Sequence, residues 1–279
     1  MIGLVRALIV FYFVVFFTRS DSLATMAPAK NYFITSDGCF LLYNLKTEKL
    51  ELVVDEKNCK QRLTACSTFK FPLALMAFDS NVIEDENTKF KWDGVHRSIE
   101  SWNQDQTALS WIRESVVWVS QQITPKLGAE SIRSYLKKFN YGNQDMSAGL
   151  TSAWLTITKT DSDSGKGSLK ISAFEQLDFL KHFWKHEMPV SSLAWEKTNR
   201  VTFIQKSPSG FDFSGKTGSG YLENLKGEFG WFVGHIQGNG KEYVMVTNFI
   251  RNRPASDSTF PGPKAREITK QILNDRGLW

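Results

Sequence analysis

Residues 64–78 have the sequence TACSTFKFPLALMAF, which places Ser67 and Lys70 three positions apart at the start of an apolar run. Apolar residues follow at steps of three and four, the spacing of a buried helix. Residues three apart on a helix share a face, so the pattern predicts that Ser67 and Lys70 touch near its N-terminus. Pro72 fits this prediction, because proline is tolerated in the first turn of a helix.

A serine hydroxyl is a weak nucleophile until a base removes its proton. Lysine serves as that base only when its amine is neutral, and burial among apolar groups lowers the lysine pKa in that direction. Ser-x-x-Lys alone is common by chance. The later sequence SGKTGSG, residues 214–220, adds Lys216-Thr217-Gly218. The two motifs together are the signature of serine β-lactamases and penicillin-binding proteins.

The composition indicates a folded protein of mildly basic character. The 279 residues are 42% hydrophobic and 13% aromatic, which is enough for a packed core in one large domain or two interleaved lobes. The net charge of +5 is spread along the chain without a run rich in lysine and arginine. We therefore expect no nucleic-acid partner.

The N-terminus has the pattern of a secretion signal. Arg6 precedes an apolar run from Ala7 to Phe17, which is shorter than the about 20 residues needed to span a bilayer. Ser22-Leu23-Ala24 supplies small residues for cleavage after Ala24. We expect residues 1–24 to be a signal peptide and the mature chain to be periplasmic, with no stable membrane insertion. An uncleaved anchor is the alternative.

Strand patterns lie at both ends of the chain. Residues 32–54 have the composition of paired strands, and two strand-like stretches near the C-terminus flank Gly238-Asn239-Gly240. A short Gly/Asn segment between such stretches is a strong hairpin signal. The simplest architecture is one antiparallel sheet built from both ends of the chain, with a helical lobe inserted between them and a binding cleft between the lobes.

Helical patterns fill the middle of the chain and close it. Periodic apolar residues occur in three stretches between residues 67 and 139. Ser172 and Glu175 form a capping-box pattern at the start of another helix. In the last helix, we expect Pro263 in the first turn and Gly277 at the stop.

Five short motifs, taken in order, resemble the motif set of class D (oxacillinase-type) β-lactamases: Ser67-Thr68-Phe69-Lys70, Ser115-Val116-Val117, Tyr141-Gly142-Asn143, Trp154 and Lys216-Thr217-Gly218. The likeness extends from about residue 38 to about residue 250. It implies an α+β serine β-lactamase/penicillin-binding-protein-like fold, with an antiparallel sheet flanked by helices. We expect one catalytic domain over 25–279, with a sheet lobe at about 25–64 and 168–279 and a helical lobe at about 65–167.

The resemblance also implies a β-lactam hydrolase with a defined catalytic set. Ser67 would form the acyl-enzyme, and Lys70, N-carboxylated by CO2, would be the general base. The indole N–H of Trp154 would donate to this carbamate, because an indole nitrogen is a donor only. Ser115 and Lys216 would pass a proton to the β-lactam nitrogen as the ring opens.

The same resemblance implies a substrate-binding set. Val117 would cover the carbamate with an apolar side chain. The backbone N–H groups of Ser67 and Ser219 would form the oxyanion hole. Thr217 and Lys216 would help to hold the substrate carboxylate, and Gly218 belongs to the same strand. An arginine early in the last helix is also expected near that carboxylate. Arg266 is the candidate, and two arginines upstream are the alternatives: Arg251 and Arg253.

The cysteines and histidines do not indicate a metal site. Cys39 and Cys59 lie in neighbouring segments, and the sequence leaves open whether they form a disulfide. Cys66 is expected to be a small buried apolar residue. His182 and His186 are four apart, but the residue after His182 is a phenylalanine, so the metalloprotease motif is absent. No metal and no cofactor is expected beyond CO2 as the carbamate on Lys70.

Two other functions compete with the hydrolase. A β-lactam-sensing penicillin-binding domain would acylate without turnover, and such sensors normally carry a large membrane region. A cell-wall transpeptidase would normally have a longer chain or an additional domain. The expected ligands are small-molecule β-lactams in each case. The sequence leaves open the preferred β-lactam and the oligomeric state.

Overall fold

The computed structural model describes residues 32–33, 37–155, 168–222, 227–251 and 260–279. The predicted signal peptide at 1–24 lies outside the described residues. Across these ranges, no helix combines the length and the apolar character that crossing a membrane requires.

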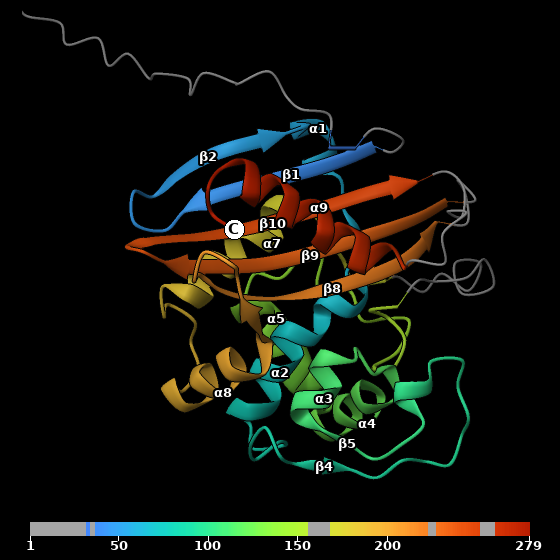
Figure 1. The fold of residues 1–279 in the computed structure, drawn as a ribbon. Coiled ribbons are helices and arrows are strands. Elements are labelled where there is room, and N and C mark those ends of the chain that lie inside the picture. Colours follow the sequence, from blue (N-terminus) through green and yellow to red (C-terminus); the bar gives the residue numbers. More distant parts are fainter. Residues whose placement is uncertain (1–31, 34–36, 156–167, 223–226, 252–259) are drawn as a thin grey trace, which may run out of the picture.

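A six-stranded antiparallel sheet forms the centre of the molecule, in the order β2-β1-β10-β9-β8-β7. The first and last strands of the chain are therefore neighbours, with Asp37 paired to Ile250 (Figure 1). This arrangement confirms the predicted fold class. The strands are β1 (Asp37–Asn44), β2 (Lys49–Val54), β7 (Phe203–Lys206), β8 (Asp212–Leu222), β9 (Gly227–Gly238) and β10 (Lys241–Arg251).

The hairpin between β9 and β10 confirms the signal at residues 238–240. Gly238 pairs with Lys241, and the two residues between them have positive φ, 50° at Asn239 and 75° at Gly240. Two consecutive positive φ angles are what a tight type I′ turn requires, and asparagine followed by glycine adopts them readily. The turn fixes the register of the two longest neighbouring strands.

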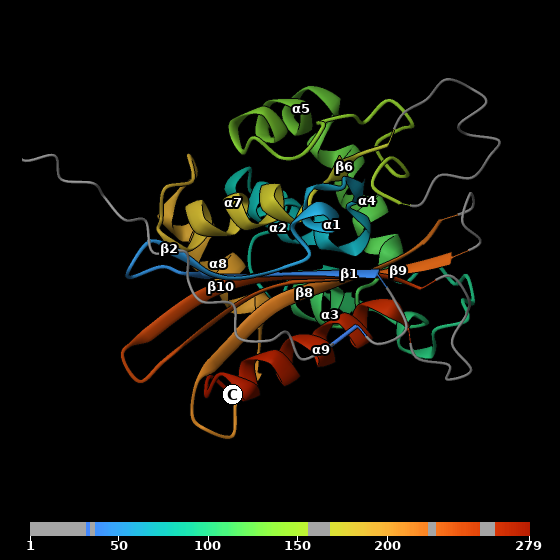
Figure 2. The ribbon, with the colours of Figure 1, turned by 90° about the horizontal axis from the view of Figure 1, so that it is seen from above.

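Both faces of the sheet are covered (Figure 2). Helix α9 (Pro261–Asp275) packs against β8, β9 and β10 on one face, and α7 (Ala173–Trp184) packs against β1, β9 and β10 on the other. Side chains alternate between the faces along β1. Phe40 packs in the hydrophobic cluster that includes residues of α9, and Leu41 packs in the cluster that includes the helices on the other face. The predicted capping box, in which Ser172 and Glu175 exchange hydrogen bonds, starts α7.

The other helices gather beside the sheet around α2, in which Lys70 to Phe78 are all buried. Helix α8 packs against α2 and α3. The lobe boundaries stay a prediction. The remaining elements are α1 (Glu56–Lys60), β3 (Leu63–Thr64), η1 (Cys66–Phe69), α2 (Lys70–Asp79), β4 (Lys89–Phe90), η2 (Glu100–Trp102), β5 (Gln106–Thr107), α3 (Ala108–Arg113), α4 (Val117–Leu127), α5 (Ala129–Lys138), β6 (Lys170–Ile171) and α8 (Ser192–Thr202).

One helical stretch of the sequence is interrupted in the structure. The periodic pattern over 108–123 is divided into α3 and α4, and Ser115 between them has a φ of 59°. A left-handed residue cannot continue a right-handed helix. The break takes the Ser115 side chain out of helical register, so that it does not follow the periodicity of its neighbours.

Cys39 of β1 and Cys59 of α1 form a disulfide, which answers the question that the sequence left open. Both cysteines are fully buried, and α1 also packs against β1. Cys66 is buried, as predicted, and is not part of a disulfide. The disulfide closes a loop of 20 residues at the edge of the sheet.

We expect the double substitution Cys39→Ala and Cys59→Ala to lower the free energy of unfolding by ~3 kcal/mol, because the unfolded chain then regains the freedom of the closed loop. Urea unfolding of the oxidised wild type and the variant measures the difference. Thiol titration in denaturant is the control. It should find one reactive thiol before reduction and three after it. Three thiols before reduction would contradict the disulfide.

Candidate active site

Ser67 and Lys70 are in direct contact, as the opening motif predicts. Ser67 lies in the short 3-10 helix η1, and Lys70 begins α2. The Lys70 Nζ donates a hydrogen bond of 2.9 Å to the Ser67 Oγ. Cys66, which precedes the serine, has a φ of 48°, a conformation that non-glycine residues rarely adopt. The chain therefore makes a sharp turn immediately before Ser67.

The Lys70 amine has no access to solvent. Its Nζ lies 5.0 Å from the centre of the Trp154 ring, and Trp154 in turn packs against Phe69. Burial, followed by repulsion from Lys216, holds the pKa of Lys70 well below its usual range. Burial therefore shifts the amine toward its neutral form, which is the form that takes up a proton or reacts with an electrophile such as CO2.

A second serine–lysine pair lies at the same site, with Lys216 on β8 and Ser115 between α3 and α4. The Lys216 Nζ donates to the Ser115 Oγ at 2.9 Å and to the Thr217 carbonyl at 3.0 Å. Burial, followed by the charge of Arg266, lowers the pKa of Lys216 to about 7. An amine with such a pKa both gives and takes a proton near neutrality.

Strand β8 approaches η1 closely at Gly218. A Cβ at this position would lie 3.1 Å from the Thr68 Cγ2 and 3.2 Å from the Thr68 nitrogen. The next residue, Ser219, accepts a hydrogen bond of 2.9 Å from the Gly262 N–H at the start of α9. A glycine at 218 thus permits the close approach of β8 to the Ser67 turn. The hydrogen bond from Gly262 ties β8 to α9.

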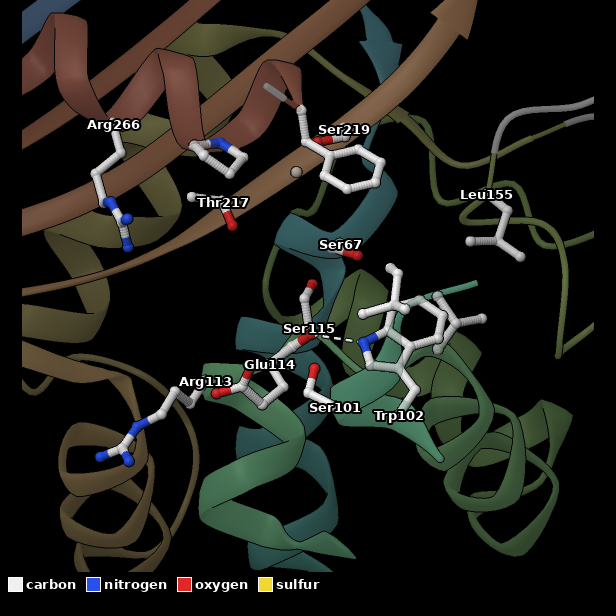
Figure 3. A pocket seen from close by; sticks show the side chains of 15 residues that line it. Ser67, Ser101, Trp102, Arg113, Glu114, Ser115, Leu155, Thr217, Ser219 and Arg266 are labelled. Carbon is white, nitrogen blue, oxygen red and sulfur yellow. Dashed lines mark hydrogen bonds between the residues drawn. The ribbon is translucent and has the colours of Figure 1, made fainter. Parts of the chain in front are cut away.

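These groups surround a cavity of about 420 Å³ (Figure 3). Seven of the ten predicted site residues line it: Ser67, Ser115, Val117, Thr217, Gly218, Ser219 and Arg266. The other three, Lys70, Trp154 and Lys216, are buried beneath the surface of the site. The structure thus brings the predicted set together.

Of the arginines considered for the substrate carboxylate, Arg266 lines this cavity. By contrast, Arg251 is engaged elsewhere, since its Nε donates to the Glu228 carboxylate at 2.8 Å. Arg253 lies outside the described residues. The geometry therefore favours Arg266 over Arg251 as the cation nearest to a bound substrate.

The donor of Trp154 does not point at the lysine amine. Its Nε1 donates to the Leu150 carbonyl at 3.3 Å, whereas the face of the ring lies beside the Lys70 Nζ. A hydrogen bond of this length is at the weak end of the range. Redirecting the donor to an acceptor on Lys70 would give up one weak hydrogen bond.

Sequence reasoning missed eight residues that also line the cavity: Ile99, Ser101, Trp102, Arg113, Glu114, Leu155, Phe260 and Pro263. Figure 3 shows the indole of Trp102 beside Ser115, and its Nε1 donates to the Glu114 carbonyl at 2.8 Å. Leu155 and Glu114 adjoin predicted residues and were detectable as neighbours. Trp102 had no local signal, because it lies in an aperiodic segment and is held by contacts made after folding.

The Tyr141-Gly142-Asn143 motif positions the segment 168–171, which includes β6. Gly142 has a φ of 56°, and a Cβ there would lie 2.2 Å from the Lys170 carbonyl oxygen. The Asn143 side chain donates to the Ser168 carbonyl and accepts from the Lys170 N–H. The motif therefore fixes β6, which pairs with β3 just before the Ser67 turn.

In the part of the chain that the structure describes, no three His, Cys, Asp or Glu side chains gather as a metal site. His182 hydrogen-bonds through its Nδ1 to the Asp178 carbonyl of its own helix, at 2.8 Å.

Comparison with known proteins supplies the family. A family model described as "Penicillin binding protein transpeptidase domain" matches residues 38–274. The chain is 37% identical to "Beta-lactamase OXA-1" of Escherichia coli, over 95% of this chain and 94% of that protein. It is 35% identical to "Methicillin resistance mecR1 protein" of Staphylococcus aureus, over 92% of this chain but 40% of that protein. A solved structure, "Class D beta-lactamase BAT-2 delta mutant", matches with a TM-score of 0.79 and 31% identity, over 92% of this chain and 98% of that one.

The low pKa of Lys216 predicts how stability depends on pH. The folded-state pKa is about 7 and the ordinary value is 10.5, so between these values the unfolded chain holds a proton that the folded protein lacks. Stability therefore rises with pH across this window, by up to ~1.4 kcal/mol per pH unit from this group. Denaturant unfolding of the wild type and Lys216→Met at pH 7, 8 and 9 measures it. The difference in free energy should grow with pH in favour of the wild type, and parallel profiles would contradict the shift.

Proposed function

This chain belongs to the penicillin-binding protein transpeptidase family and, within it, to the class D β-lactamases, and we propose that it hydrolyses β-lactams through an acyl-enzyme on Ser67. The observation that carries the proposal is the contact of 2.9 Å between the Ser67 Oγ and the fully buried Lys70 amine. A hydroxyl next to a base of lowered pKa is the arrangement that activates a serine nucleophile.

Acylation follows from this pair. In the N-carboxylated form proposed below, Lys70 would remove the proton of Ser67 as the Ser67 Oγ attacks the β-lactam carbonyl carbon. The carbonyl oxygen becomes an oxyanion, for which we propose the backbone N–H groups of Ser67 and Ser219 as donors. Each such donor stabilises a transition state of this kind by ~3 kcal/mol. The close approach of β8 to η1 at Gly218 supports the assignment.

Ring opening breaks the bond between the carbonyl carbon and the lactam nitrogen, and this nitrogen needs a proton. We assign that proton to Ser115, which gives it to the nitrogen and regains one from Lys216. The hydrogen bond of 2.9 Å between them and the Lys216 pKa of about 7 support this assignment. Thr217 and Arg266 line the same side of the cavity and would hold the substrate carboxylate.

Lys70 is proposed to carry CO2 as a carbamate. A neutral amine is what reacts with CO2, and burial shifts Lys70 toward that form. When present, the carbamate supplies a carboxylate that accepts a proton from Ser67 and later from the hydrolytic water. A buried anion requires hydrogen-bond donors, and the indole N–H of Trp154 would turn from the Leu150 carbonyl to provide one. Val117 would keep water from the group.

The chain is proposed to act in the periplasm after removal of residues 1–24. The Cys39–Cys59 disulfide supports an oxidising compartment.

A β-lactam sensor is the second candidate function, because the chain is 35% identical to the mecR1 protein. The chain is also 37% identical to the β-lactamase OXA-1, and we therefore propose the hydrolase as the main function.

We expect the purified protein to turn over a chromogenic cephalosporin many times per Ser67. The measurement is product formed per mole of enzyme, with Ser67→Ala as the inactive control. A burst of one equivalent followed by no further product would instead identify the sensor. Absence of any burst would contradict both functions.

We expect Trp154→Phe to slow deacylation by at least about 10-fold, because the variant keeps the aromatic packing but loses the donor for the proposed carbamate. Accumulated acyl-enzyme measured by mass spectrometry, and partial recovery with added bicarbonate, test this effect. Trp195→Phe is the matched control, since the Trp195 indole donates to the Phe183 carbonyl instead.

A labelled-CO2 adduct should appear by NMR in the wild type and not in Lys70→Ala. Its absence from active wild type would refute the carbamate.

A further inference from the structure

A row of buried hydrogen bonds links helix α7 to the turn that carries Ser67. The Tyr141 hydroxyl donates to the Gln176 Oε1 at 3.3 Å, and the Gln176 Nε2 donates to the Thr68 Oγ1 at 2.8 Å. The Thr68 hydroxyl then donates to the Ala65 carbonyl at 2.5 Å. None of the four residues is more than 1% exposed. Water is therefore poorly placed to replace any partner, and losing one leaves a buried polar group unsatisfied.

The donors and acceptors in this row can be arranged in only one order. The Thr68 hydroxyl uses its one hydrogen on Ala65, so it can only accept from Gln176. Gln176 must therefore present its NH2 group to Thr68 and its oxygen to Tyr141. A leucine or a methionine at position 176 has no hydrogen to donate to Thr68, so either residue breaks the row there.

The turn itself depends on such external support. Cys66 has a left-handed φ of 48°, and Ala65 at the N-cap of η1 offers no capping side chain. Two bonds hold the chain before the serine: the Ala65 N–H donates to the Leu169 carbonyl, and the Trp231 indole donates to the Thr64 carbonyl. The Thr68 hydroxyl reaches back across Ser67 to Ala65, so it closes the turn around the nucleophile.

Thr68 also sets the distance between the turn and β8. It is the neighbour that a side chain at Gly218 would meet first, at 3.1 Å. A shift of Thr68 therefore changes the spacing between Ser67 and Ser219, the two residues whose N–H groups are assigned to the oxyanion. Gln176 acts from α7, which packs on β1, β9 and β10. The Gln176 amide thus connects the Ser67 turn to α7, a helix that packs on the sheet.

We propose that Gln176 is a positioning residue for acylation, which acts through Thr68 on the placement of the Ser67 nucleophile and its oxyanion donors. The inference rests on the proposed function. Misplacement of reacting groups by about 1 Å costs on the order of 100-fold in rate. We therefore expect loss of the Gln176–Thr68 hydrogen bond to slow acylation by about 10-fold or more, without weakening the initial binding of the β-lactam.

Single-turnover acylation by a fluorescent penicillin tests the proposal in the whole protein. The concentration dependence gives the acylation rate constant and the dissociation constant of the non-covalent complex, and the amplitude gives the fraction of active protein. Gln176→Leu and Gln176→Met should lower the rate constant about 10-fold, leaving the dissociation constant within about twofold. A variant that is only less stable would lose amplitude instead.

Thr68 provides an independent pair of variants. Thr68→Val removes the hydroxyl, and with it the bond to the Ala65 carbonyl as well, so it should lose at least as much rate as Gln176→Leu. Thr68→Ser keeps the hydroxyl and should acylate near the wild-type rate. Combining Thr68→Val with Gln176→Leu should add little further loss, because both remove the same hydrogen bond. Gln121→Met is the matched control, since the Gln121 side chain donates to the Thr151 carbonyl away from the turn. Its acylation rate constant should not change.

The outcomes distinguish failure of the positioning role from failure of the proposed function. If the wild type is acylated but the Gln176 variants keep its rate constant, the positioning role is wrong and the proposed function stands. The positioning role is equally wrong if Thr68→Val and Thr68→Ser acylate at the same rate. If the penicillin does not acylate the wild type at all, the proposed function fails, and the inference fails with it.

Discussion

The burial of two lysine amines in one site is the constraint on which the rest of this structure depends. Lys70 and Lys216 are almost inaccessible to solvent, and the group beside each is another cation, which lowers the pKa of both. A charged amine in such surroundings is costly, so each is held toward its neutral form. Each also contacts a serine hydroxyl. Burial thereby favours the form of each amine that can accept a proton.

The sheet and the helices supply different halves of this arrangement. Ser67, Lys70 and Ser115 come from the helical side, whereas Lys216 to Ser219 come from β8. The catalytic set exists only where η1 and β8 meet, and glycine at 218 permits the close contact. Helix α9 adds Arg266 and holds Ser219 through Gly262. The site is therefore a property of the junction and not of either half.

The sequence was sufficient to predict the sheet from both chain ends, the β9–β10 hairpin and the spacing of Ser67 and Lys70, because each follows from local periodicity or turn chemistry. It was not sufficient for Trp102, whose position depends on contacts with Glu114 and Trp118 formed in the folded state. The break at Ser115 was hidden by apolar periodicity on both sides. Gln176 is one polar residue on an apolar helix face, and its role becomes visible only when its partners are placed. The choice between Arg251 and Arg266 needed the ion pair with Glu228.

The pairing of β1 with β10 has a consequence for how the molecule is made. Asp37 meets Ile250 across the centre of the sheet, so nearly the whole polypeptide must be available before its middle layer can close. Contacts so distant in sequence form slowly, since a very long loop must first be closed. During synthesis, the turn that carries Ser67 would therefore be made before β8, which completes the site. The active site would form only once the last strands of the chain had been made.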